Sequence, residues 1–178
     1  MYTRRFGLLA LSLLLLISIT GISGQTPQKK AAKPSMGGMV AVAPGTETWG
    51  DIPAAAMVGT PSVDMGGTLK LAIVQGDPMT AGRSYTIHLS CTDGTKIASH
   101  WHPATENVTV LKGAVRVGMG PKWDDASLSE MGVGGFASVP AHMIHYAQCK
   151  GDTILQVHGI APFLINFVDA NGDPKPTK

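Results

Sequence analysis

The chain has 178 residues, of which 14 are Lys or Arg, 12 are Asp or Glu and 44% are hydrophobic. This length suits one domain with a sizeable core. The charge is nearly balanced and no basic cluster is interleaved with aromatic residues, which argues against a nucleic-acid partner.

Residues 1–24 have the pattern of a secretory signal peptide. Arg4 and Arg5 precede an apolar run over residues 8–19, and small residues follow at Ser23 and Gly24. A retained membrane anchor would usually need about twenty apolar residues. We therefore expect cleavage near residue 24, export to the periplasm or the outside of the cell, and no membrane attachment afterwards. Removing this segment leaves 12 basic and 12 acidic residues.

Residues 25–48 are predicted to form a flexible linker or arm. They include three lysines and a Met-Gly-Gly-Met patch, and their apolar residues follow no period of 2 or 3.6. We expect the ordered domain to span residues 49–170, and the polar, proline-containing residues 171–178 to form a tail.

Residues 69–168 have the pattern of an all-β domain. Tyr85, Ile87 and Leu89 alternate with polar residues, as in a half-buried strand. Lys112–Gly113 separates two apolar runs and predicts a hairpin, and a helical turn is expected within 124–131. Many short strands separated by turn residues predict a sandwich or barrel. The expected strands are 69–74, 85–90, 108–111, 114–117, 136–139, 145–149, 154–158 and 163–168.

His100 and His102 form the clearest chemical signal. Side chains alternate across a β-strand, so these two histidines point to the same face. Glu106 lies an even number of residues from both histidines, so its side chain can point to the same face if Pro103 bends the strand without ending it. Two imidazoles and a carboxylate directed at one point are most of a divalent transition-metal site. His145, which follows Pro140 in the second half of the chain, is the candidate fourth ligand.

The spacing of these residues resembles that of the cupin superfamily. Residues 94–113 match its first motif, G-x5-HxH-x3-E-x6-G, at every fixed position. The second motif, G-x5-PxG-xx-H-x3-N, is matched at Gly134, Pro140 and His145. His142 stands where that motif has glycine, which predicts a turn that needs no positive φ, and Cys149 stands where it has asparagine.

The resemblance implies a double-stranded β-helix, or jelly-roll, barrel with a metal bound by His100, His102, Glu106 and His145. It also implies a small-molecule substrate or ligand and a homodimer. We expect the catalytic residues to be Glu106, as ligand and proton acceptor, and His142. The interpretations open for His142 are a hydrogen-bond donor behind a ligand, a general base near the metal, or a surface histidine at a turn.

Such a site suits Fe, Mn, Ni, Zn or Cu, and the residues do not decide between these metals. By analogy the protein is expected to be a dioxygenase-like enzyme. The alternatives are a Lewis-acid hydrolase, decarboxylase or isomerase, and a module that binds a metal or small ligand without turnover.

The remaining histidines and the cysteines are expected to be structural. His88 and His158 lie in predicted strands, and Trp101 should point away from the two histidines that flank it. A disulfide between Cys91 and Cys149 is permitted in an exported protein, but their spacing in the sequence does not show that they meet. We favour two separate, partly buried thiols.

Overall fold

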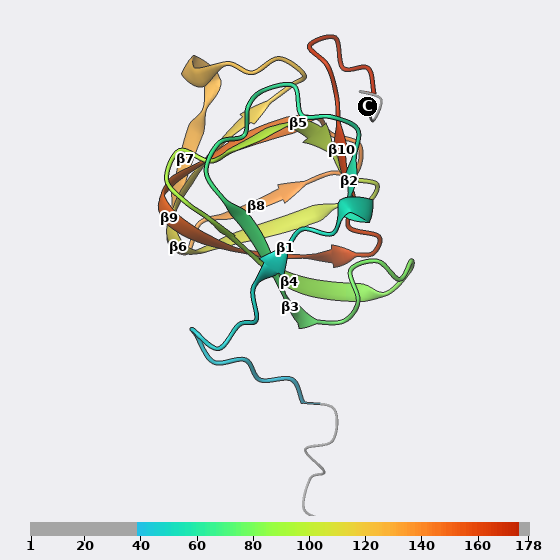
Figure 1. The fold of residues 1–178 in the computed structure, drawn as a ribbon, viewed down its shortest axis with the longest axis vertical. Helices are drawn as coiled ribbons and strands as arrows, with labels where there is room; N and C mark the ends of the chain where they lie inside the picture. Colours follow the sequence, from blue (N-terminus) through green and yellow to red (C-terminus); the bar gives the residue numbers. More distant parts are fainter. Residues whose placement is uncertain (1–38, 175–178) are drawn as a thin grey trace, which may run out of the picture. The chain divides into compact units, whose positions relative to one another are not determined.

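The computed structural model describes residues 39–174 (Figure 1). The predicted signal peptide, most of the predicted linker and the last four residues lie outside the described residues. Within residues 39–174, no helix is long and apolar enough to cross a membrane.

The described chain is built almost entirely of strands, so the all-β prediction is confirmed. The two helices are single 3₁₀ turns, η1 (Ala54–Ala56) and η2 (Asp125–Ser127). The strands are β1 (Gly50–Asp51), β2 (Met57–Val58), β3 (Leu69–Gln75), β4 (Ser84–Cys91), β5 (Lys96–Trp101), β6 (Glu106–Met119), β7 (Ser129–Gly132), β8 (Phe136–Val139), β9 (His145–Ile160) and β10 (Ile165–Phe167).

The ten strands form one curled sheet around a common interior (Figure 1). Along one path the order is β1-β3-β4-β9-β5-β10-β2. The long strand β9 pairs with β4 through its second half and with β5 through its first half, and β6 runs along its other side. Strands β7 and β8 pair in turn with β6. Inward-facing side chains such as Ile87, Val110 and Val157 are fully buried and form the core.

The predicted hairpin at Lys112–Gly113 is wrong, because β6 continues through these residues as one strand. Gly113 has a φ of 69° and lies where the β6–β9 register shifts, so it bends the strand without reversing it. A Cβ atom on Gly113 would lie 2.7 Å from the carbonyl oxygen of Asp152. Likewise, β9 bends at Gly151 and continues, although a break between two strands was predicted there. The paired bends form the corner at which the sheet folds over.

The connection after β6 also differs from expectation. Residues 125–127 form the predicted helical turn, but Ser129–Gly132 form strand β7. This strand pairs with the second half of β6, from Ala114 to Val117.

Cys91 and Cys149 form a disulfide, so the prediction of two separate thiols is wrong. The end of β4 and the first half of β9 bring their Cα atoms to 6.3 Å, within the usual range for a disulfide. The two residues are 58 positions apart in the sequence, and only the pairing of β9 with its neighbours brings them together.

We predict that the double substitution Cys91→Ala/Cys149→Ala lowers the free energy of unfolding by about 2–4 kcal/mol, because the open chain regains conformational entropy when unfolded. Urea unfolding at equilibrium measures the change. Dithiothreitol should destabilise the native protein to a similar extent and leave the double variant unaffected. Equal urea midpoints for the oxidised native protein and the double variant would contradict the prediction.

We also predict that Gly118→Ala destabilises the barrel. A Cβ atom at this position of β6 would collide with the fully buried ring of Tyr146. Overpacking of this kind costs about 1–3 kcal/mol, which thermal or urea unfolding resolves. Gly132→Ala is the matched control, because a Cβ atom there meets no atom within 4 Å. A loss of stability no greater than that of the control would refute the account.

Candidate metal centre

Four side chains converge at one end of the barrel interior. His100 comes from β5, His102 follows that strand directly, Glu106 is the first residue of β6 and His145 is the first residue of β9. Their exposed fractions are 3%, 5%, 7% and 4% respectively. The structure thus brings together all four residues that the sequence singled out as ligands.

A bulge in β5 turns His100 inward. Ile97 pairs with Ala147 and His100 with His145, so three steps along β5 match two along β9. Residues three apart on a regular strand face opposite sides, yet Ile97 and His100 line the same cavity. The extra residue, within Ala98–Ser99, changes the alternation and places both side chains inside.

The ligand atoms are close enough to share one ion. The Nε2 atoms of His100 and His102 are 3.1 Å apart. The Glu106 carboxylate lies 3.5 Å from Nε2 of His102 and 3.3 Å from Nε2 of His145. The potential ligand atoms of the three histidines all lie within 4.8 Å of one another. Glu106 therefore contacts two members of a three-histidine cluster.

Backbone carbonyls fix the orientation of every imidazole. Nδ1 of His100 donates to the carbonyl of Ala98 at 2.7 Å, and Nδ1 of His102 donates to that of Leu164 at 2.6 Å. Nδ1 of His145 donates to the carbonyl of Met143 at 3.0 Å. A carbonyl oxygen only accepts, so each Nδ1 carries a proton, and each ring presents its Nε2 lone pair to the site when it is neutral.

This arrangement fits a bound cation. The Nε2 atoms of His100 and His102 face each other, and with both lone pairs unprotonated they repel unless a positive charge lies between them. Imidazole nitrogens and a carboxylate are the ligands that Fe, Mn, Ni, Zn and Cu accept. The donor set therefore matches a divalent transition metal without selecting one.

The electrostatics of the four groups favour the same conclusion. Burial lowers the pKa of His100 well below its usual range, and the nearby His145 and His102 lower it further. Burial also lowers the pKa of His102, against the opposing charge of Glu106. These two imidazoles are thus neutral and ready to bind a metal.

Glu106 and His145 shift each other's pKa, because their side chains lie 3.3 Å apart in a buried site. Burial raises the pKa of Glu106, but the charges of His102 and His145 and a hydrogen bond from His145 outweigh it and lower the pKa. Burial acts to lower the pKa of His145, but the hydrogen bond to Glu106 and the charge of Glu106 outweigh burial, so the pKa is raised. A bound divalent cation would compete with a proton for Nε2 of His145.

Aromatic side chains support the cluster from behind. The His102 ring stacks on Phe163, with centroids 5.3 Å apart and planes 19° apart, and His100 meets Phe167 edge-on. Both phenylalanines are 2% exposed. Both lie in a predicted strand, and Phe163 was predicted to be a core residue; contact with a metal ligand was not predicted, because the sequence does not distinguish it from ordinary core packing.

His142 lies outside the cluster. Its side chain is exposed and its ring packs against Trp101 at a centroid distance of 4.8 Å. Its backbone N–H donates to the carbonyl of His102, and the Pro140–Met143 hydrogen bond closes a turn around it. Its φ is 63°, so the prediction that this turn needs no positive φ is wrong. Among the three interpretations, the structure places His142 at a surface turn.

His88 and His158 also lie away from the cluster. His88 is buried and its Nδ1 lies 3.2 Å from the carboxylate of Glu47, which belongs to the segment before β1. His158 pairs with Thr86 and Asn107 in the middle of the sheet. His88 thus links the sheet to the segment before β1, and His158 is part of the sheet itself.

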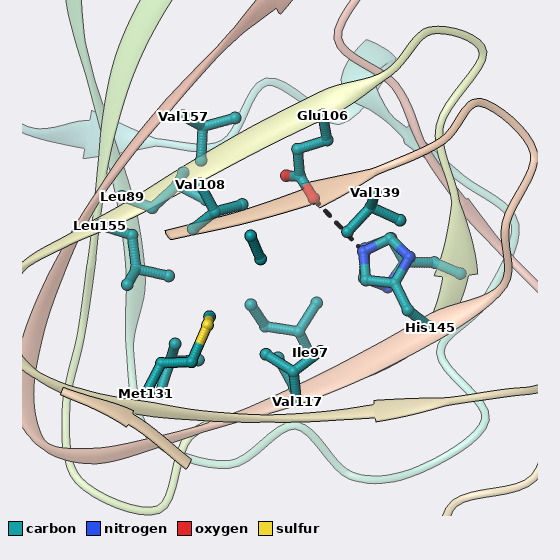
Figure 2. A pocket seen from close by; sticks show the side chains of 14 residues that line it. Leu89, Ile97, Glu106, Val108, Val117, Met131, Val139, His145, Leu155 and Val157 are labelled. Atoms are coloured by element: carbon teal, nitrogen blue, oxygen red, sulfur yellow. Dashed lines mark ion pairs between the residues drawn. The ribbon is translucent and has the colours of Figure 1, made fainter. Parts of the chain in front are cut away.

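An apolar cavity of about 50 Å³ adjoins the site. Glu106 and His145 lie at one end of it, and the side chain of Met131 lies on the opposite side of the cavity (Figure 2). The remaining wall is aliphatic and comes from β4 to β9. Sequence reasoning identified these residues only as core, because a lining residue and a packed residue have the same composition.

Comparison with known proteins supports the fold. No family model and no curated protein matches the sequence. The structure is similar to the polyketide cyclase RemF from Streptomyces resistomycificus, with a TM-score of 0.51, 16% identity and coverage of 68% of this chain and 79% of that chain. It is also similar to a candidate acetylacetone dioxygenase from Methylibium petroleiphilum PM1, with a TM-score of 0.50, 19% identity and coverage of 72% and 79%.

A cupin superfamily protein from Desulfitobacterium hafniense DCB-2 is a further similar structure, at a TM-score of 0.43, 15% identity and coverage of 52% of this chain and 77% of that chain. The curled sheet of this chain is a double-stranded β-helix with the cupin fold, as its motifs predicted. At 16% and 19% identity, the two likenesses with TM-scores of 0.51 and 0.50 establish the fold and leave the reaction open.

We predict that the purified protein binds about one equivalent of a divalent transition metal and that His145→Ala weakens binding by at least 100-fold, since one ligand and the partner of Glu106 are lost. Elemental analysis and competition with a chelator measure the two quantities. His88→Ala is the matched control, because it removes a buried histidine outside the cluster. Equal metal affinity in both variants would contradict the assignment.

Proposed function

We propose that this protein is an exported, metal-dependent enzyme acting on a small molecule, with dioxygenation as the leading reaction class. One observation supports this above all others: three imidazoles and a carboxylate converge, and His100, Glu106 and His145 of this cluster line an apolar cavity. A structural metal site needs no cavity beside it, whereas a catalytic one needs room for a substrate.

When bound, a redox-capable divalent metal would supply a Lewis-acidic centre with one or two positions free of protein ligands. His100, His102 and His145 hold that centre through nitrogens whose orientation is fixed by backbone carbonyls. The aliphatic wall excludes water from the space next to it.

We assign the proton-accepting role to Glu106 and withdraw it from His142. The Glu106 carboxylate lines the cavity, is ionised, and can take a proton from a substrate held there. The His142 ring instead lies on the surface against Trp101. Through its backbone N–H, His142 helps position His102.

The structural neighbours indicate which reaction to test first. One of the two most informative structures is described as a candidate acetylacetone dioxygenase. A dioxygenase that cleaves a carbon–carbon bond and places both atoms of O₂ in its products takes all the electrons from its substrate, so it needs no external reductant, which suits a protein outside the cytoplasm. For this reason dioxygenation is the preferred reaction class in our proposal.

A Lewis-acid reaction is the second candidate. The other informative neighbour is described as a polyketide cyclase, and a metal held by three imidazoles can polarise a carbonyl without using O₂. If zinc instead took all four side chains as ligands, the site would be closed and the protein would be a binding module.

The disulfide supports the proposal of export. Disulfides persist in the periplasm and outside the cell and are rare in the cytosol, and both cysteines of this chain are in one. Residues 1–24, which resemble a signal peptide, would direct export, and the protein would act in the periplasm or outside the cell. A homodimer, as the cupin resemblance implies, remains part of the proposal.

We predict that the metal-loaded protein consumes O₂ when supplied with a short β-diketone, and that Glu106→Gln reduces turnover by at least 100-fold. An oxygen electrode and product analysis with ¹⁸O₂ measure this reaction. His88→Ala, which keeps the site intact, should retain activity. Turnover that continues without O₂ would replace dioxygenation by the Lewis-acid reaction, and metal binding without turnover on either class would favour the binding module.

A further inference from the structure

The wall of the cavity restricts the chemistry of its ligand. Among the described residues that line it, His100, Glu106 and His145 are the polar ones, and the other eleven are Ala, Val, Ile, Leu or Met. These described lining residues include no hydroxyl or amide side chain and no Lys or Arg. A sugar, an amino acid or a phosphorylated compound would leave polar groups buried there without partners, at a cost of a few kcal/mol for each group.

The volume of the cavity restricts the size of its ligand. A cavity needs a volume of about 10–15 Å³ to hold one water-sized group. The cavity of about 50 Å³ therefore accommodates roughly three to five non-hydrogen atoms. A six-membered aromatic ring exceeds this space. The part of a ligand that enters the cavity is therefore a short aliphatic group.

Met131 limits the length of that group. It comes from β7, a strand that pairs only with β6 among the described strands, and its side chain lies on the far side of the cavity from Glu106 and His145 (Figure 2). It packs against the core while remaining partly exposed. A methionine side chain is unbranched and adaptable, and its removal would lengthen the cavity by several atoms.

We infer that the site selects a small ligand with an oxygen-bearing headgroup at the histidine cluster and an uncharged aliphatic tail of about three to five carbons, and that Met131 sets the tail length. The headgroup assignment rests on the proposed metal function. The tail assignment rests on the cavity wall alone, so the two can fail separately.

Alkyl hydroxamates test the inference without turnover, because their two oxygens chelate transition metals and their tails can be varied. Titration of the metal-loaded protein with tails of one to eight carbons should show affinity rising about fourfold for each methylene that fits, then falling at least tenfold beyond the optimum. Benzohydroxamate should bind more weakly than the best alkyl compound. Equal affinity across the series would overturn the inference.

Two variants locate the limit at Met131. Met131→Ala should move the optimum to tails two or three carbons longer, whereas Met131→Leu, which nearly conserves volume, should leave it unchanged. An unchanged optimum in Met131→Ala, with the fold intact by circular dichroism, would overturn the role of this residue.

The metal-free protein provides a readout independent of the proposed function. Labelled with ¹³C at the methionine methyl groups, it should show a shift of the Met131 signal with 1-butanol and none with 1-octanol; Met131→Leu assigns the signal. If no metal binds and 1-butanol still shifts Met131, the metal function fails while the aliphatic cavity stands. If neither alcohol shifts the signal in native protein and neither stabilises Met131→Ala, the tail assignment fails.

Discussion

The bulge at Ala98–Ser99 is the constraint on which the site depends. It allows β5 to contribute Ile97 to the cavity wall and His100 to the cluster, although a regular strand would place them on opposite faces. The same local geometry lets the carbonyl of Ala98 accept a hydrogen bond from the Nδ1–H of His100. One extra residue in a strand thus determines both the direction of the His100 side chain and which of its ring nitrogens carries the proton.

Much of the site could be predicted because its signal is local. The alternation of a strand relates His100 to His102, and parity extends this relation to Glu106. His145 required the family resemblance, since its proximity to His100 depends on the pairing of β5 with β9. Aliphatic residues such as Val117 and Met131 gave no such signal, because their position beside a cavity depends on how the whole sheet curls.

The errors have a common physical origin in strands that bend. Gly113 and Gly151 have the positive φ of turn residues, and in an isolated sequence they indicate chain reversal. Here they bend β6 and β9 while the hydrogen-bonded ladder continues on both sides. The disulfide was missed for a related reason: the distance between Cys91 and Cys149 is set by sheet pairing. His142 shows that a non-glycine residue can occupy a left-handed turn position, here with its ring packed on Trp101.

Part of the cavity wall lies far along β6 and β9 from the ligands that these strands carry. Glu106 and His145 are the first residues of β6 and β9, whereas wall residues such as Val115 and Leu155 lie near or beyond the bends of those strands. A substitution at such a distant wall residue therefore changes what fits the cavity without moving a ligand's backbone. Divergence of such a barrel can proceed through wall residues one at a time, with each intermediate keeping its cluster, so new specificities are accessible by single-residue steps.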